Sequence, residues 1–109
     1  MFQLHFTGDK VLMSDDVCGA LLRYARALAD THTSDIVSLP VVTDTSEVTI
    51  AEFLLGPASQ LFATRVPGMA EKGTDAAVVA DLAQRTERLR PSKAAALDPP
   101  DADAFDDTE

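Results

Sequence analysis

The side chains whose types could carry chemistry in this chain are two histidines, one cysteine and one serine that follows a glycine turn. His5 and His32 offer imidazole, the usual general base and metal ligand in proteins. Cys18 offers a thiol near the start of a predicted helix, a position that lowers thiol pKa values. Ser59 offers a hydroxyl in the run GPASQ. The neighbouring residues decide between a chemical and a structural role for each.

The two histidines lie in different kinds of segment. Apolar residues alternate with polar ones over residues 2–6, so His5 is predicted to point away from the apolar face. His32 lies in a polar linker between Asp30 and Asp35, a cluster that could bind a divalent ion. Since no further histidine or thiolate stands nearby to complete the ligand set, we expect no metal site.

The cysteine and the serine favour structural roles. A helical wheel places Cys18 at the edge of an apolar stripe, and a free cysteine there commonly behaves as a small buried hydrophobe. Ser59 lies between two predicted strands, whereas a nucleophile elbow needs a strand, a turn and a helix. We predict a tight corner in which Ser59 satisfies a turn amide. With no glycine-rich phosphate loop either, we expect no catalytic residue, no cofactor and no enzyme activity.

Length and composition set the class of the chain. Its 109 residues fit one domain, and 46% of them are apolar, which is enough for a packed core. A single cysteine excludes an internal disulfide and fits a reducing compartment. The N-terminal residues lack the basic and apolar regions of a signal peptide, and no run approaches the length of a membrane span. We therefore expect a cytoplasmic protein that does not contact a membrane.

The formal charge of −9 is unevenly distributed. Residues 91–109 carry six acidic residues against Lys93, and residues 1–90 carry the remaining excess, twelve acidic against eight basic. Such a chain repels phosphate backbones, so we expect no direct nucleic-acid binding. A protein partner or self-association is the expected mode of interaction.

The hydrophobic pattern predicts an α+β domain over residues 1–90 with the element order ββαβββα. About five strands form an antiparallel sheet with two helices. The expected strands cover residues 2–6, 11–13, 35–43, 47–55 and 60–66, and the expected helices run from Asp15 to Ala29 and from Thr74-Asp75 to Arg90. Gly8-Asp9 is the expected turn of the first hairpin. The last three strands are predicted to form a meander, with Pro40 confining its strand to a sheet edge or marking a bulge.

The acidic C-terminal tail, residues 91–109, is predicted to be disordered because its composition cannot bury enough apolar surface. Phe105 has Asp101 and Asp103 before it and Asp106 and Asp107 after it, and it resembles in its chemistry acidic tails that insert one aromatic ring into a basic pocket. The competing interpretation is a solubilising extension.

The outer face of the first helix supplies the remaining interaction candidates. Arg23 and Arg26 could dock an acidic partner, although Arg26 and Asp30 have the spacing of an ordinary ion pair within the helix. Gly19 on the same face costs helix stability and could permit close approach by another backbone.

Three runs, GALLRYARALAD, AEFLLGPASQLFATRVPG and VVADLAQRTERLRP, carry a resemblance. Together with the composition, which is rich in Ala, Asp, Val and Arg and poor in Lys, they look similar to small actinobacterial or actinophage proteins of about this length. The resemblance covers residues 1–90 and implies an α+β fold and a cytoplasmic location, with no activity attached.

These observations favour a non-enzymatic protein-interaction module that could self-associate and that carries an acidic tail as modulator. An alternative hypothesis is an acidic mimic of nucleic acid, which requires carboxylates arrayed on one folded surface. A third hypothesis is a small enzyme, which requires a histidine beside a carboxylate and a hydroxyl in one pocket.

Overall fold

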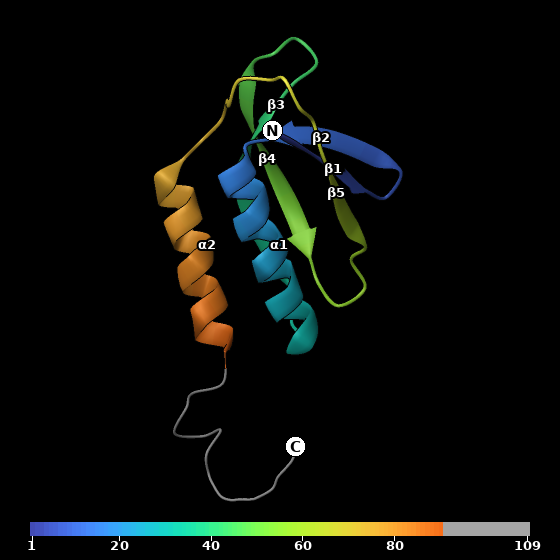
Figure 1. Ribbon diagram of the computed structural model, residues 1–109. Coiled ribbons are helices and arrows are strands. Elements are labelled where there is room, and N and C mark those ends of the chain that lie inside the picture. The colour runs from blue at the N-terminus through green and yellow to red at the C-terminus, as the bar shows by residue number, and fades with distance from the viewer. Residues whose placement is uncertain (91–109) are drawn as a thin grey trace, which may run out of the picture.

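The structure is a computed structural model that describes residues 1–90 (Figure 1). Its elements are β1 (Phe2–Phe6), β2 (Asp9–Met13), α1 (Asp15–Asp30), β3 (Asp35–Val42), β4 (Val48–Leu55), β5 (Leu61–Arg65) and α2 (Ala76–Leu89). The predicted order ββαβββα and the α+β class are confirmed. The predictions for residues 91–109 lie outside the described residues.

The five strands form one antiparallel sheet in the order β4-β3-β2-β1-β5. β1 and β2 are joined by a two-residue turn in which Thr7 and Gly8 both have positive φ, at 44° and 81°. Such turns match the twist of the flanking strands. The turn lies one residue earlier than predicted, because Asp9 already pairs with Phe6.

The predicted meander of the last three strands is wrong. β5 pairs with β1 at the opposite edge of the sheet, with Phe2 opposite Arg65 and Phe6 opposite Leu61. The connection Gly56–Gln60 carries the chain from the end of β4 to that edge. In this position Leu61 and Ala63 pack against the core, and β4 keeps one unpaired side.

Pro40 lies in an inner strand, β3, where we had predicted a sheet edge or a bulge. β3 has β4 on one side and β2 on the other, but it pairs with β2 only between Val42 and Leu12. Pro40 therefore lies where the second side of β3 has no strand partner, and its missing N–H breaks no ladder there.

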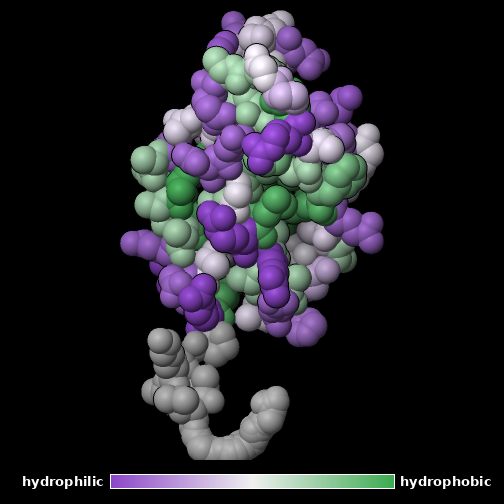
Figure 2. All heavy atoms as spheres, in the orientation of Figure 1, coloured by the Kyte–Doolittle hydropathy of each residue, from purple (hydrophilic) through white to green (hydrophobic). Residues whose placement is uncertain are grey.

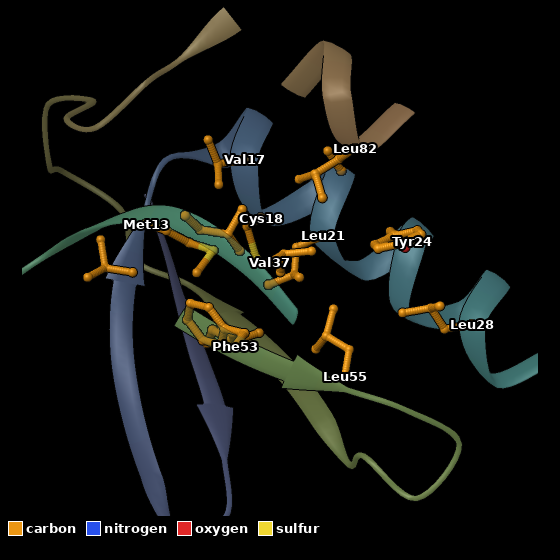
Figure 3. Close-up of a cluster of buried hydrophobic side chains, with 14 residues drawn as sticks. Met13, Val17, Cys18, Leu21, Tyr24, Leu28, Val37, Phe53, Leu55 and Leu82 are labelled. Atoms are coloured by element: carbon orange, nitrogen blue, oxygen red, sulfur yellow. The ribbon is translucent and has the colours of Figure 1, made fainter. Parts of the chain in front are cut away.

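α1 begins at a serine cap and packs along one stripe. The Val17 amide donates to Ser14 Oγ at 3.3 Å, and Asp15 and Asp16 occupy the first turn, as predicted. Its buried side chains face the core side of the sheet, where they meet residues of β1, β3 and β4 (Figure 3). Those of α1 are Val17, Cys18, Ala20, Leu21, Tyr24 and Leu28.

α2 lies beside α1 rather than directly on the sheet (Figure 1). Asp75 caps it by accepting from the amides of Ala77 and Val78, and Leu82 is its fully buried residue. Because so little of α2 is buried, polar contacts contribute to its position. Neither helix of residues 1–90 is long and apolar enough to cross a membrane.

The connection from β5 to α2 is fastened by the chain's amino terminus. The Met1 ammonium lies 2.8 Å from Asp15 Oδ1 and 2.8 Å from Glu71 Oε2. These contacts raise the pKa of the ammonium above its ordinary value, Asp15 more than Glu71. The next residue, Lys72, donates from Nζ to the Ser46 carbonyl at 2.8 Å, which ties the connection to the β3–β4 turn.

Candidate functional site

Exposed apolar side chains form a row on the face of β3 and β4 that turns away from α1. Val37, Leu39, Phe53 and Leu55 of these strands are buried in the core. Side chains alternate between the two faces of a strand, so the even-numbered residues belong to the opposite, outer face. Ile36 is 60% exposed, Ile50 62% and Leu54 73%. We call Ile36, Val48, Ile50 and Leu54 the outer row.

The register of β3 and β4 brings the outer row together. Ile36 lies opposite Leu54, and Ile50 lies opposite Pro40. Gly73 of the β5–α2 connection packs near Pro40 and Val48, so one end of the face is covered. Ile50 remains exposed beside this end, and Ile36 and Leu54 remain exposed at the other end. Single exposed apolar residues are normal on a protein surface, whereas several on one face suggest a contact surface.

The free edge of β4 lies next to the outer row. The Thr43 amide donates to the Glu47 carbonyl at 2.8 Å, and this bond fixes the phase of the β3–β4 ladder. Antiparallel ladders alternate, so the even residues of β4 form the pairs that are not hydrogen bonded to β3. Their N–H and C=O groups, from Val48 to Leu54, point to the edge that no strand of the sheet pairs with.

A cleft of about 960 Å³ adjoins the end of β4. It lies between the β1–β2 turn and the connection Gly56–Gln60, and Leu54 and Phe62 contribute apolar surface to it. Leu54 belongs to both the cleft and the outer row, whereas Phe62 belongs to β5 at the opposite edge of the sheet. The Gly56 amide donates to Ser59 Oγ at 3.0 Å, so Ser59 has the turn role that we predicted.

The structure places the two histidines in separate environments. His5 points to the outer face of β1, where its ring stacks on Phe62 at 4.2 Å between centroids and its Nε2 lies 2.8 Å from Thr64 Oγ1. His32 lies in the α1–β3 linker with φ of 53°. Among residues 1–90 no group of three or more side chains could hold a metal ion.

Cys18 is buried in the core, as the helical wheel predicted. Burial, with a smaller contribution from Asp15, raises the pKa of its thiol to about 11. The effect of burial on the thiol pKa is larger than that of the helix N-terminus, which by itself would lower this pKa. The thiol therefore stays protonated and packs as an apolar group.

The arginine candidates on α1 line a groove between the ends of the two helices. The groove measures about 500 Å³ and includes Arg23 and Arg26. Arg26 Nε lies 3.7 Å from Asp30 Oδ2, the predicted pair within the helix. At Gly19, the atoms nearest to an added Cβ belong to the Arg23 guanidinium, the closest at 3.4 Å. The space beside Gly19 is thus taken by a side chain, and within residues 1–90 no other backbone approaches it.

The carboxylates that a nucleic-acid mimic would use come from several elements of the fold. Asp15 binds the Met1 ammonium, and Asp16 occupies the same turn of α1. Asp44 and Glu47 flank the β3–β4 turn, and Glu52 lies on the outer face of β4. Phe105, Asp106 and Asp107 lie outside the described residues.

The sequence reasoning missed the outer row. Residues 35–43 are apolar at both odd and even positions, a pattern typical of a strand buried on both faces. In the structure a helix covers only one of those faces. Ile50 and Leu54 are apolar residues at outward positions of β4, so apolar residues on both faces of the strand were the available signal.

No protein family, curated protein or solved structure was found to match this chain.

Proposed function

We propose that this protein is a non-enzymatic interaction module that self-associates through the free edge of β4 and the outer row. The observation that carries the proposal is the combination of unpaired backbone groups from Val48 to Leu54 with exposed apolar side chains on the same residues. Natural proteins usually protect such edges with charges, prolines or bulges. β4 carries one charged residue, Glu52, along its eight residues.

A second copy of the chain is a suitable partner because β4 can pair with itself around a two-fold axis. With the axis beside Ala51, Val48 of each strand lies opposite Leu54 of the other, and Ile50 lies opposite Glu52. An axis at Glu52 would place the two carboxylates directly opposite each other, which is unfavourable. The register with the axis beside Ala51 therefore pairs Val48 with Leu54 at both ends and keeps the two Glu52 carboxylates apart.

The placement of the reactive side chains supports a binding role over catalysis. His5 is engaged with Phe62 and Thr64, and Cys18 is buried with a raised thiol pKa. Ser59 accepts a turn amide. A catalytic site needs a base, a nucleophile and an orienting group engaged with one another. His5 and Ser59 both line the cleft of about 960 Å³, but the imidazole forms a hydrogen bond with Thr64 and the Ser59 hydroxyl accepts one from the Gly56 amide.

Sedimentation equilibrium of the full chain tests the proposal, with the dissociation constant of the dimer as readout. Ile50→Glu places a carboxylate opposite Glu52 twice in the symmetric dimer, and each such pair costs up to about 1 kcal/mol. We expect dimerisation to weaken by roughly 30-fold. Ile50→Lys creates two pairs of opposite charge at the same positions, so it should weaken dimerisation much less.

Phe62→Lys is the matched control, because Phe62 is 61% exposed on the outer face of β5, away from the β4 edge. It should leave the dimer unchanged. A wild-type chain that remains monomeric at high concentration would refute self-association. Equal weakening by Ile50→Glu and Ile50→Lys would refute the register, and weakening by Phe62→Lys would point to another surface.

A further inference from the structure

A groove of about 500 Å³ lies between the C-terminal ends of α1 and α2. The two helices run in the same direction, so these ends lie together (Figure 1). The lining residues are Arg23, Arg26, Ala27, Asp30 and Thr31 from the side of α1, and Thr86, Leu89 and Arg90 from the side of α2. Figure 2 shows hydrophilic residues over this region. Leu89 contributes apolar surface to the lining of the groove.

The groove carries an excess of positive charge, with three arginines against Asp30. Arg23 makes no ion pair with any of residues 1–90. Arg26 and Arg90 pair with Asp30 and Glu87 at 3.7 and 3.2 Å, and all four of these side chains are highly exposed. Exposed pairs of this kind contribute little stability, so the guanidinium groups can bind other carboxylates at small cost.

The acidic segment of the chain begins at the rim of this groove, because Arg90 lines it and residues 91–109 follow directly. Those residues hold six acidic side chains against one lysine. Phe105 follows Arg90 by 15 residues; an unstructured chain of that length spans roughly 20 Å. A short connection of this kind gives an effective concentration on the order of 1 mM, so even a weak contact would be substantially occupied.

We propose that residues 98–109 bind in this groove of their own chain. The ring of Phe105 lies against Leu89, and the carboxylates of Asp106 and Asp107 lie beside Arg23 and Arg26. Opposite charge and an aromatic ring near guanidinium groups both favour this contact. The segment is then a built-in competitor for any acidic partner of these arginines. The contact is independent of the pairing proposed for β4.

Paramagnetic relaxation in the full chain tests the contact. Thr108→Cys adds a thiol for a nitroxide label, and the Cys18 thiol does not compete because it is buried with a raised pKa. We expect the amide signals of Ala27 and Thr86, beside the groove, to lose several-fold more intensity than that of Gly8 in the β1–β2 turn. At about 0.5 M salt, where the screening length is roughly 4 Å, the selective loss should fall sharply.

Charge-matched variants identify the groove. Arg23→Glu with Arg26→Glu should abolish the selective loss at Ala27 and Thr86. Lys10→Glu with Arg88→Glu makes the same change in net charge at positions outside the groove and should preserve it. Phe105→Ala should reduce the loss strongly, because the ring is the apolar part of the contact.

Four results would contradict the proposal. Equal intensity loss at Gly8, Ala27 and Thr86 would show that the segment has no preferred place. Persistence of the selective loss in the Arg23 and Arg26 variant would place the contact elsewhere. Selective loss in a mixture of labelled protein and a separate isotope-enriched copy would show that the segment binds a second molecule instead. Persistence of the loss in Phe105→Ala would refute the aromatic contact.

Discussion

Replacing Asp35 with alanine should destabilise the fold by separating three elements that one carboxylate holds together. The Tyr24 hydroxyl of α1 donates to Asp35 Oδ2 at 2.5 Å, and Arg85 Nη1 of α2 donates to the same oxygen at 2.6 Å. Asp35 itself begins β3, and its Oδ1 accepts from the Ile36 amide at 2.8 Å. α2 buries little else, so this contact matters for its position.

The magnitude follows from the two lost hydrogen bonds to other elements, since water can replace the local bond to the exposed Ile36 amide. A hydrogen bond to a charged group contributes about 1.5 to 3 kcal/mol to stability. Asp35 and Arg85 are each about a third exposed, so solvent screening should reduce the contribution of each bond below about 1.5 kcal/mol. We expect Asp35→Ala to cost about 2 kcal/mol and Tyr24→Phe about 1 kcal/mol. For a domain of this size, a loss of 2 kcal/mol lowers Tm by roughly 8 °C.

The effect should depend on pH with a definite sign. The Tyr24 hydroxyl, followed by Arg85, lowers the pKa of Asp35 below its ordinary value of 3.8. A carboxylate with a lowered pKa in the folded state stabilises it above the unfolded pKa, and this contribution is lost as the pH falls through the folded value. The stability difference between wild type and Asp35→Ala should therefore be full at neutral pH and shrink below about pH 4.

Urea unfolding of the single and double variants measures the coupling. Because Tyr24 and Asp35 act together, Tyr24→Phe should cost about 1 kcal/mol in the wild type and almost nothing when Asp35 is already alanine. Asp81→Ala is the matched control, since Asp81 accepts from Arg85 Nε at 2.8 Å but forms an exposed pair within α2. It should cost at most about 0.5 kcal/mol. An equal cost of Tyr24→Phe in both backgrounds would refute the proposed coupling.

Three further predictions concern single side chains. Leu82→Ala should cost about 3 kcal/mol in urea unfolding, because Leu82 is 1% exposed and is the buried anchor of α2; fast amide exchange confined to α2 should accompany it. Ser14→Ala should cost about 1 kcal/mol through loss of the cap on the Val17 amide, with unchanged stability counting against that role. The Cys18 thiol, with a folded pKa of about 11 against an ordinary value of 9.0, should make the protein lose stability between these values as the pH rises. Cys18→Ala should weaken that dependence, and the Met1 ammonium, whose pKa is also raised, should account for the remainder; urea midpoints at pH 8 and pH 10 would show the difference.

Local features of the chain were readable in the sequence because they depend on neighbouring residues. The alternation in residues 2–6, the Ser14 cap and the apolar stripe around Cys18 are set within one strand or one helical turn. The element order and the burial of Cys18 followed directly from them. The arginine pair on α1 was found in the same way, from spacing within a helix.

The tertiary structure alone decided which strands pair and which faces stay open. β5 pairs with β1, although β4 precedes it directly, because strand pairing depends on contacts between residues about 60 positions apart. The bond between Asp35 and Arg85 likewise joins residues 50 positions apart. The same pairing leaves the edge of β4 free and its outer row exposed, since an apolar strand pattern does not say whether one face or both will be covered.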